Sequence, residues 1–407
     1  MRIGLFTDTY PPYINGVSTS TMMLKKALEK EGNKVYVVTV NPDNLKFVYD
    51  EKEHILRMPG IPTGIYDYRL TEIYSIKALS YIKKWHLDII HTQTEFGVGT
   101  FARVIAKQYK IPLVHTYHTM YEDYIGYITK GHFDKPSKKL VEYFTKFYCD
   151  TTVEELIVPT KKTYELFKEK YNYDRNIHII PTGIEIERFY DENINKKRVL
   201  EIKENLNIKN DDFVILYVGR LGYEKSIDFL IDAQATFVHK NPKCKLVIVG
   251  DGPDLPKFEK QVKKLKIEEN VIFTGKVPWE DVPFYYNICT VFSTASKTET
   301  QGLTVIEAMA AGRPVICIDD ESFRNVVING LDGYLFKNKK EYKKIILNLF
   351  DNNETVKKLG NQARISSEVY SSKYFAKRAM DVYKLAIGKT AKKSFKDKLK
   401  EVVYGKK

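Results

Sequence analysis

The chain has 407 residues, more than a single hydrophobic core usually organises, so two domains are expected. Its hydrophobic fraction of 43% is that of a globular protein, and no apolar run approaches the length of about eighteen residues that a membrane-spanning helix needs. The N-terminus also lacks the long apolar run of a signal peptide. The four cysteines (Cys149, Cys244, Cys289 and Cys317) are widely spaced, which disfavours a disulfide framework or a metal site and predicts a cytoplasmic chain with reduced thiols.

The net charge of +13 is concentrated at the C-terminus. Residues 389–407 hold eight lysines against Asp397 and Glu401, a net of +6. This excess favours a polyanionic partner, which could be an anionic membrane, a nucleic acid or a phosphorylated substrate. A generally lysine-rich composition would account for much of the same excess.

Short apolar runs alternate with amphipathic stretches along the first half. The expected strands are Ile3–Phe6, Lys34–Val40, Asp88–His91, Leu113–Tyr117, Leu156–Val158 and Ile177–Ile180. The expected helices are Val17–Glu31, Gly97–Tyr109, Lys138–Tyr148 and Lys161–Tyr171. The strands are apolar on both faces, as in a parallel sheet covered by helices, so the pattern predicts an α/β fold.

The second half repeats this alternation. Its expected strands are Phe213–Val218, Cys244–Val249, Val271–Thr274, Cys289–Ser293 and Val315–Ile318. Polar segments at 191–198 and 207–212 separate the two halves. We therefore expect two Rossmann-like domains facing each other across a cleft, at 1–190 and 205–370, followed by a helix at 371–388 and a basic amphipathic tail at 389–407.

Two segments of the first half are candidate site elements. Gly16 precedes a helix, where a backbone without Cβ allows close approach and the following N–H groups can face an anion. His118 ends a strand and could hydrogen-bond a sugar hydroxyl or a phosphate oxygen. A lone glycine before a helix and a structural histidine are the ordinary alternatives.

Arg220 and Lys225 straddle the turn after the first strand of the second half. Ligands of open α/β sheets bind at the carboxyl ends of strands, and paired cations can stabilise a departing diphosphate. Gly250-Asp251-Gly252 and Thr274–Pro278 are two further strand ends that could border a nucleoside. Two surface cations at a turn are the alternative reading.

The segment from Ser296 to Val315 carries two carboxylates eight positions apart. Glu299 lies before an expected helix that Gly302 opens, and Glu307 lies on that helix. The helix N-terminus offers unpaired N–H groups, which makes it a natural phosphate site. One acid on each side of such a site suits a sugar nucleotide, which has hydroxyls at both ends of a diphosphate. The alternative is a buried helix with a surface acid before it.

This segment resembles the Glu-x7-Glu signature of retaining GT-B glycosyltransferases of the family-4 type, and the flanking Gly-Leu and Glu-Ala-Met-Ala-x-Gly-x-Pro-Val words fit as well. The resemblance covers nearly the whole chain. It implies a GT-B fold whose last helix, around Tyr374–Ile387, returns to the first domain. It also implies a nucleotide-sugar donor and transfer with retention, without a required metal or other cofactor.

The resemblance also implies roles for the candidate residues. Arg220 and Lys225 match the residues that neutralise the diphosphate, and Gly16, Gly302 and Leu303 match its backbone contacts. His118 and Glu299 match residues near the transferred sugar, while Glu307 matches the residue that holds the ribose. The residues with implied catalytic roles are therefore His118, Glu299, Arg220 and Lys225. Those implied to bind the nucleotide sugar are Gly16, Arg220, Lys225, Gly302, Leu303 and Glu307.

A narrower resemblance, to bacterial diacylglycerol glucosyltransferases, rests on residues 6–17 and 116–124 and on the charge pattern. Three basic amphipathic stretches, Arg69–Leu87, Lys135–Tyr148 and the tail, could lie on an anionic bilayer. We therefore expect glucose transfer from UDP-glucose to a membrane lipid, with the protein peripheral on the inner face of the cell membrane. The rivals are a soluble or polymeric acceptor and a non-catalytic basic binding protein. No RNA-binding signature is evident, and the sequence does not specify an oligomeric state.

Overall fold

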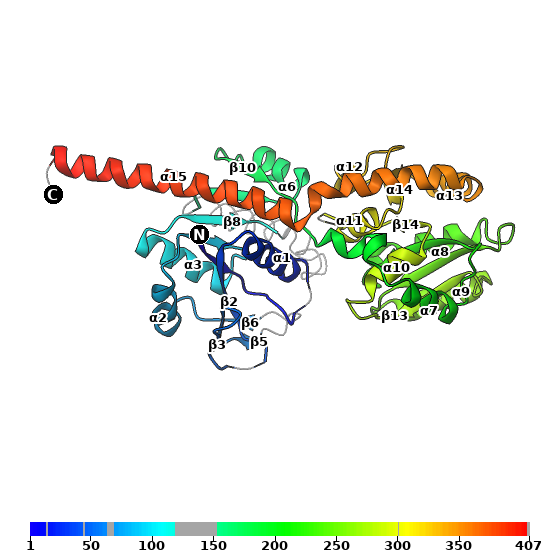
Figure 1. Ribbon diagram of the computed structural model, residues 1–407, viewed down its shortest axis with the longest axis horizontal. Helices are drawn as coiled ribbons and strands as arrows, with labels where there is room; N and C mark the ends of the chain where they lie inside the picture. Colours follow the sequence, from blue (N-terminus) through cyan, green and yellow to red (C-terminus); the bar gives the residue numbers. More distant parts are fainter. Residues whose placement is uncertain (14, 44, 63–68, 119–152, 300, 405–407) are drawn as a thin grey trace. The chain divides into compact units, whose positions relative to one another are not determined.

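The computed structural model describes residues 1–13, 15–43, 45–62, 69–118, 153–299 and 301–404, with side chains described up to residue 392 (Figure 1). The chain divides into two compact units. Unit 1 comprises Met1–Gly183 and Ser372–Lys407, and unit 2 comprises Ile184–Ser371.

The sheet of unit 1 has eight strands among the described residues, and its two faces are both covered. Their order is β10 (Ile177–Ile179), β9 (Glu155–Val158), β8 (Leu113–Thr116), β7 (Ile89–Thr92), β1 (Arg2–Phe6), β2 (Lys34–Val40), β4 (Ile55–Met58) and β3 (Val48–Asp50). Every pairing is parallel except that of β3 with β4. A short hairpin of β5 (Ile61–Pro62) and β6 (Arg69–Leu70) lies outside this sheet.

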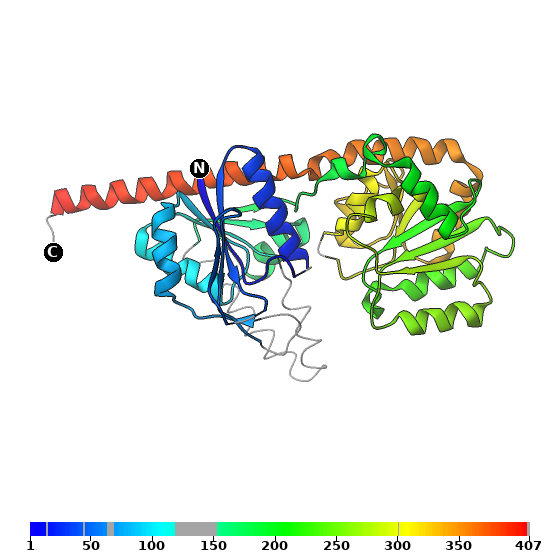
Figure 2. The same cartoon turned by 60° about the horizontal axis from the view of Figure 1, so that its bottom comes forward.

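The helices of unit 1 form layers on both faces of that sheet (Figures 1 and 2). They are α1 (Gly16–Lys30), α2 (Ile76–Trp85), α3 (Gly97–Tyr109), α6 (Lys161–Glu165) with a π-helical turn η1 (Leu166–Lys170), and α15 (Ser372–Tyr404). Neighbouring residues of β1 pack into different hydrophobic clusters on the two faces of the sheet. Leu5 packs with α1 and α15, whereas Phe6 packs with α2 and α3. This alternation explains why the strands are apolar on both faces.

Helix α15 joins the C-terminus to unit 1, as the family resemblance implies. Its buried side chains share a core with β1 and α1; they are Phe375, Ala376, Ala379, Val382, Tyr383 and Ala386. Further along, the Lys389 ammonium lies 2.6 Å from the buried Glu155 carboxylate of β9. The helix continues without a break to Tyr404, through most of the basic tail.

The sheet of unit 2 is entirely parallel. Its order is β13 (Val271–Gly275), β12 (Cys244–Val249), β11 (Phe213–Val218), β14 (Val291–Thr294), β15 (Val315–Ile318) and β16 (Gly333–Phe336). The strand order reverses around β11, which lies between β12 and β14. In open α/β sheets ligands bind at such a reversal, beyond the carboxyl ends of the strands.

Helices and single turns surround the second sheet. They are η2 (Ile186–Phe189), η3 (Asp191–Asn193), α7 (Lys196–Asn205), η4 (Tyr223–Lys225), α8 (Ile227–Ala235), α9 (Leu255–Leu265), α10 (Val282–Ile288), α11 (Leu303–Ala310), α12 (Glu321–Arg324), α13 (Lys339–Asp351), α14 (Asn353–Ser367) and η5 (Glu368–Tyr370).

The division between the units falls at 183/184, earlier than the expected end of the first domain at 190. The polar segment 191–198 and the residues on either side of it pack into the core of unit 2, through Ile186, Phe189, Ile194, Val199 and Ile202. Charged residues that face solvent separate these apolar residues. The composition of the segment is therefore polar although one of its faces is buried.

The amphipathic stretch Arg69–Leu87 is not one helix. Residues 69–70 form β6, and α2 begins only at Ile76, where Ser75 caps it. The predicted helix Lys138–Tyr148, with the basic stretch that contains it, lies outside the described residues.

Candidate active site

Three strand ends of unit 2 are held together by their backbones. The N–H of Leu221 donates to the carbonyl of Asp251 at 2.9 Å, and the N–H of Gly250 donates to Gly275 at 3.0 Å. Gly250 has φ of +138°, and a Cβ there would come within 1.9 Å of the Gly219 carbonyl oxygen. The turns after β11, β12 and β13 are therefore packed backbone against backbone, and glycine is required at that contact.

Lys225 and Glu299 meet at this edge of the sheet. The Lys225 ammonium lies 2.6 Å from Glu299 Oε1, and both side chains are largely buried. Lys225 comes from η4, after β11, whereas Glu299 comes from the loop after β14. The structure thus brings together a cation and an acid that are 74 positions apart in the sequence.

Arg220 lies in the same turn but is more accessible, with 57% of its side chain exposed. Its guanidinium bonds the Glu224 carboxylate, and its carbonyl accepts a bond from the Tyr217 hydroxyl at 3.3 Å. Asp254 accepts the backbone N–H of Tyr223 at 2.8 Å and so holds the start of η4. The turn is fixed while the Arg220 guanidinium faces solvent.

The start of helix α12 holds the backbone of Glu299 in place. The Ser322 hydroxyl donates to the Glu299 carbonyl at 2.6 Å, and Asp320 in turn accepts from Ser322. Gly302 is the N-cap of α11 with φ of +69°, and a Cβ there would lie 2.7 Å from the Phe323 ring. Because Gly302 has no side chain to cap the helix, the first turn from Leu303 presents its N–H groups outward, which favours an anion.

Glu307 lies on α11, one turn beyond Leu303. Its carboxylate accepts the Tyr286 hydroxyl of α10 at 2.7 Å. Burial raises the pKa of Glu307 to about 7, although the Tyr286 bond and the nearby Arg188 charge both oppose the rise. Its protonation state therefore changes close to neutral pH.

Arg188, which the sequence did not single out, belongs to the same neighbourhood. Its guanidinium carbon lies 3.2 Å from the centroid of the Trp279 ring, and it donates to the Trp279 carbonyl at 3.2 Å. Burial lowers the pKa of Arg188, while Glu185, Glu307 and Glu280 raise it. Neither Arg188 nor Trp279 stands out in the sequence by itself, and the two residues are 91 positions apart.

In unit 1, Gly16 opens helix α1. Asn15 is the N-cap, and its side-chain oxygen accepts the N–H of Ser18 at 2.9 Å. Asn15 also donates to Thr9 at 2.8 Å, which ties the loop after β1 to the helix start. A Cβ at Gly16 would meet no atom within 4 Å, so the helix start is open to a ligand at this residue.

His118 lies just beyond β8, at the carboxyl edge of the same sheet. Its Nε2 is 2.7 Å from Oε1 of the buried Gln93 side chain, at the end of β7. Burial lowers the pKa of His118 to about 4, so the ring is neutral at physiological pH. Because Gln93 Oε1 accepts from Nε2, the neutral ring has Nδ1 as its acceptor, which can bond a hydroxyl.

A buried polar network supports this edge. His91 of β7 bonds the Tyr383 hydroxyl of α15 and the Thr116 hydroxyl of β8, both at 2.7 Å. His115 bonds Glu95 at 3.0 Å. The end of β8, and with it the position of His118, is therefore fixed partly by the C-terminal helix.

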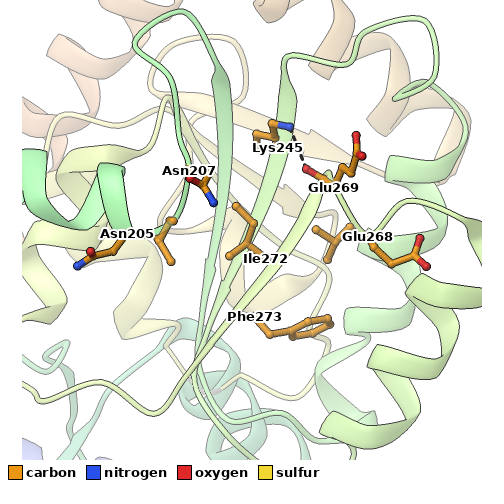
Figure 3. A pocket seen from close by; sticks show the side chains of 9 residues that line it. Asn205, Asn207, Lys245, Glu268, Glu269, Ile272 and Phe273 are labelled. Atoms are coloured by element: carbon orange, nitrogen blue, oxygen red, sulfur yellow. Dashed lines mark hydrogen bonds between the residues drawn. The ribbon is translucent and has the colours of Figure 1, made fainter.

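The candidate residues thus form two groups. Arg220, Lys225, Glu299, Gly302, Leu303 and Glu307 gather at the carboxyl edge of the unit 2 sheet, whereas Gly16 and His118 lie at the carboxyl edge of the unit 1 sheet. A separate open cavity at the edge strand β13 is lined by Asn205, Asn207, Lys245 and Ile272, among others (Figure 3). It contains none of the predicted site residues.

Two further findings concern metal-binding groups and membrane-spanning helices. Within the described ranges, no three His, Cys, Asp or Glu side chains are grouped so as to hold a metal ion. No helix in the same part of the chain is long and apolar enough to cross a membrane.

The fold matches solved glycosyltransferase structures along almost its full length. Anabaena HepE in complex with UDP aligns with a TM-score of 0.72 at 17% identity, covering 94% of this chain and 99% of that one. Sucrose-phosphate synthase of Thermosynechococcus elongatus aligns with a TM-score of 0.72 at 20% identity, covering 94% and 98%. The predicted GT-B fold class is confirmed.

The sequence comparisons define the family. The model for glycosyl transferases group 1 matches residues 199–366, and that for glycosyltransferase family 4 matches residues 14–188. Alpha-monoglucosyldiacylglycerol synthase of Acholeplasma laidlawii is 36% identical, over 97% of this chain and 99% of that protein. The synthase of the same name from Streptococcus pneumoniae is also 36% identical, over 95% and 86%. The chain belongs to the family-4 glycosyltransferases.

Proposed function

We propose that the protein transfers glucose from UDP-glucose to 1,2-diacylglycerol with retention, forming an alpha-glucosyl diacylglycerol. The observation that carries this proposal is the 36% identity, over nearly the whole of this chain, to two synthases of alpha-monoglucosyldiacylglycerol from different organisms. The solved neighbours that contain UDP or UDP-glucose support the choice of donor.

The donor half of the proposal rests on the group of residues in unit 2. Lys225 and Arg220 neutralise the diphosphate, and the start of α11 at Gly302 and Leu303 contributes N–H groups to it. Glu307 accepts hydroxyls of the ribose, and Glu299 contacts hydroxyls of the glucose. The exposed guanidinium of Arg220 can leave Glu224 for a phosphate at small cost, because surface ion pairs typically contribute at most about 1 kcal/mol.

The proposed step is a single substitution at C1 of glucose. The bond from C1 to the β-phosphate oxygen breaks, and a bond from C1 to the acceptor hydroxyl oxygen forms on the same face. The proton of that hydroxyl passes to the leaving phosphate oxygen, so UDP carries it away. Lys225 and Arg220 stabilise the charge that develops on the phosphate, and the step requires no metal ion.

The acceptor half requires access to a membrane, and exposed apolar side chains of unit 1 support it. Ile61 and Leu70 pair across the β5–β6 hairpin and are both more than half exposed. Ile73 is likewise exposed, and Ile76 at the start of α2 is 79% exposed. Exposed apolar residues beside cations are typical of a membrane-contacting surface.

The cations come from α2 and the tail. Ala78, Ile82 and Trp85 of α2 are core residues, so the apolar face of this helix packs on its own unit. Its Lys77, Lys83 and Lys84 remain exposed. Together with the tail, which carries +6, they support reversible attachment to an anionic inner membrane face.

A donor and acceptor panel tests the proposal. The full chain is incubated with radiolabelled UDP-glucose, UDP-galactose, UDP-N-acetylglucosamine and GDP-mannose, each with extracted membrane lipids or with soluble sugars. We expect label from UDP-glucose in a chloroform-soluble product, unchanged in amount by a chelator. Label transferred only to a water-soluble or polymeric product would contradict the lipid acceptor.

A further inference from the structure

We propose that Gln93 is a positioning residue for His118, because its side-chain amide fixes the ring tautomer in which Nδ1 accepts a hydrogen bond from a substrate hydroxyl. The inference rests on the proposed function, since the hydroxyl is that of glucose or of diacylglycerol. It adds a residue to which neither the sequence motifs nor the family comparisons assigned a role.

The first step is the fixed backbone on both sides of the contact. Gln93 follows β7, and its N–H donates to the carbonyl of Phe6 at 2.8 Å. On the neighbouring strand, the N–H of Tyr117, just before His118, donates to the carbonyl of Ile157 at 3.0 Å. The two side chains that meet are therefore held by backbones that the sheet fixes.

The second step is the contact between the side chains. Gln93 is 2% exposed, and its Oε1 lies 2.7 Å from His118 Nε2. The other amide atom, Nε2 of Gln93, is buried and has no hydrogen-bond partner within the described ranges. A buried donor that is left unpaired costs free energy. The burial of this amide is therefore better explained by its bond to His118 than by a gain in stability.

The third step is a comparison with two other histidines near the ends of β7 and β8. Both ring nitrogens of His91 and of His115 are bonded to groups of unit 1, at 3.0 Å or less. In the part of the chain that the structure describes, His118 bonds through Nε2 alone. Its Nδ1 is therefore the ring nitrogen that remains for a ligand.

The charges around the ring decide whether Nδ1 is an acceptor. Burial lowers the pKa of His118 to about 4, against the raising effect of the Glu95 carboxylate, which is itself bonded to His115. The ring is therefore neutral, with one N–H and one free nitrogen. Because Gln93 Oε1 is an acceptor, it favours the tautomer with the proton on Nε2. Without Gln93 the ring is free to carry its proton on either nitrogen.

The first experiment observes the tautomer by NMR, with the histidine rings of the full chain labelled with nitrogen-15. The ring signals that disappear in His118→Ala assign His118. We expect a protonated Nε2 and an unprotonated Nδ1 in wild type near neutral pH. Gln93→Met, which has a similar size and no acceptor oxygen, should give a mixture of tautomers. A proton on Nδ1 in wild type, which an amide rotated by half a turn would impose, would overturn the inference.

The second experiment tests whether Gln93 acts through His118. We expect Gln93→Met to lower kcat/KM for glucose transfer by about three- to tenfold, which corresponds to one hydrogen bond, and to have no further effect in a His118→Ala background. Gln234→Met is the matched control, because Gln234 is equally buried but bonds the Cys244 carbonyl in unit 2. It should change neither the His118 signals nor kcat/KM. An undiminished effect of Gln93→Met in the His118→Ala background, or no effect in wild type, would overturn the inference.

Calorimetry separates the two sources of the hydroxyl. If it belongs to glucose, Gln93→Met should bind UDP-glucose more weakly than wild type does and bind UDP equally well. If it belongs to diacylglycerol, both affinities should be unchanged, and the loss in kcat/KM should appear when diacylglycerol is varied. A wild type that shows the expected tautomer but transfers no glucose would instead count against the proposed function, so the two failures are distinguishable.

Discussion

The pairing of Lys225 with Glu299 shows how single residues make this site. Each side chain is held by its own turn, Lys225 by the η4 turn that Asp254 anchors and Glu299 by Ser322. A cation that is already fixed at the position where charge develops loses little entropy when the reaction needs it. The motifs predicted that Lys225 and Glu299 belong to one site, but only the fold shows that their side chains are within bonding distance.

We expect Lys225→Ala to lower turnover by a factor on the order of 10²–10³, because it removes a fixed charge from the leaving diphosphate. Arg220→Ala should act in the same direction. The measurement is kcat with UDP-glucose, with circular dichroism as the control for folding. Lys384→Ala changes an exposed lysine of α15, is the matched control and should retain full activity. A folded variant that carries both substitutions and turns over at a near-normal rate would contradict the assignment of Lys225 and Arg220 to the diphosphate.

Glu307 and Glu299 should separate binding from rate. Glu307→Ala removes the carboxylate assigned to the ribose, so the dissociation constant for UDP should increase. Glu299→Ala should mainly lower kcat, because UDP lacks the sugar to which Glu299 is assigned. Calorimetry with UDP and steady-state kinetics give the two quantities. Unchanged UDP affinity in a folded Glu307→Ala variant would be inconsistent with the ribose role.

At the scale of elements, helix α11 carries both the N-terminus that we propose faces the diphosphate and Glu307, and its start depends on one glycine. Gly302→Ala forces a left-handed backbone on a residue with Cβ and drives that Cβ to 2.7 Å from the Phe323 ring. We expect a loss of stability of at least about 1 kcal/mol, since strain and overpacking add, and a marked loss of activity. Thermal unfolding and kcat/KM are the readouts.

Gly32 provides the matched control for this substitution. It also has a positive φ, +79°, but a Cβ there would meet no atom within 4 Å. Gly32→Ala should therefore cost stability through backbone strain and leave the activity of the folded protein intact. Equal activity losses in the two variants would mean that the start of α11 has no special role.

Local patterns predicted most elements of the fold. Lys34–Val40, Gly97–Tyr109, Phe213–Val218, Cys244–Val249 and Val315–Ile318 form as expected, because apolar periodicity and end signals agree there. The basic amphipathic stretch Arg69–Leu87 is helical only from Ile76, because tertiary pairing makes residues 69–70 a strand of the β5–β6 hairpin. Arg188 and Trp279 could not be paired from the sequence, because their contact exists only after unit 2 has folded.

At the scale of the whole molecule, the chain combines a family-4 glycosyltransferase fold with an uneven charge distribution. As far as Tyr404, the backbone of the tail belongs to the continuous helix α15, which is anchored in the core of unit 1. Each Lys or Arg near an anionic surface contributes about 1 kcal/mol, and this attraction fades within about 8–10 Å at physiological salt.

We therefore expect the protein to float with anionic vesicles at low salt and to be released by added salt. Replacing Ile73 and Ile76 by Ser should weaken flotation without affecting UDP binding, because both side chains are exposed and belong to unit 1. Ile365→Ser, an equally exposed substitution in unit 2, is the control. Equal binding to neutral and anionic vesicles at all salt concentrations would contradict the electrostatic attachment.

The central claim is tested most directly by identifying the product. The full chain is incubated with UDP-glucose and vesicles that contain diacylglycerol, and the lipid product is examined by proton NMR at the anomeric position. We expect one glucose on the free hydroxyl of diacylglycerol, with the small anomeric coupling constant of an α-linkage, and no product from Lys225→Ala. A β-linked product, or turnover of UDP-glucose without any glucosylated lipid, would contradict it.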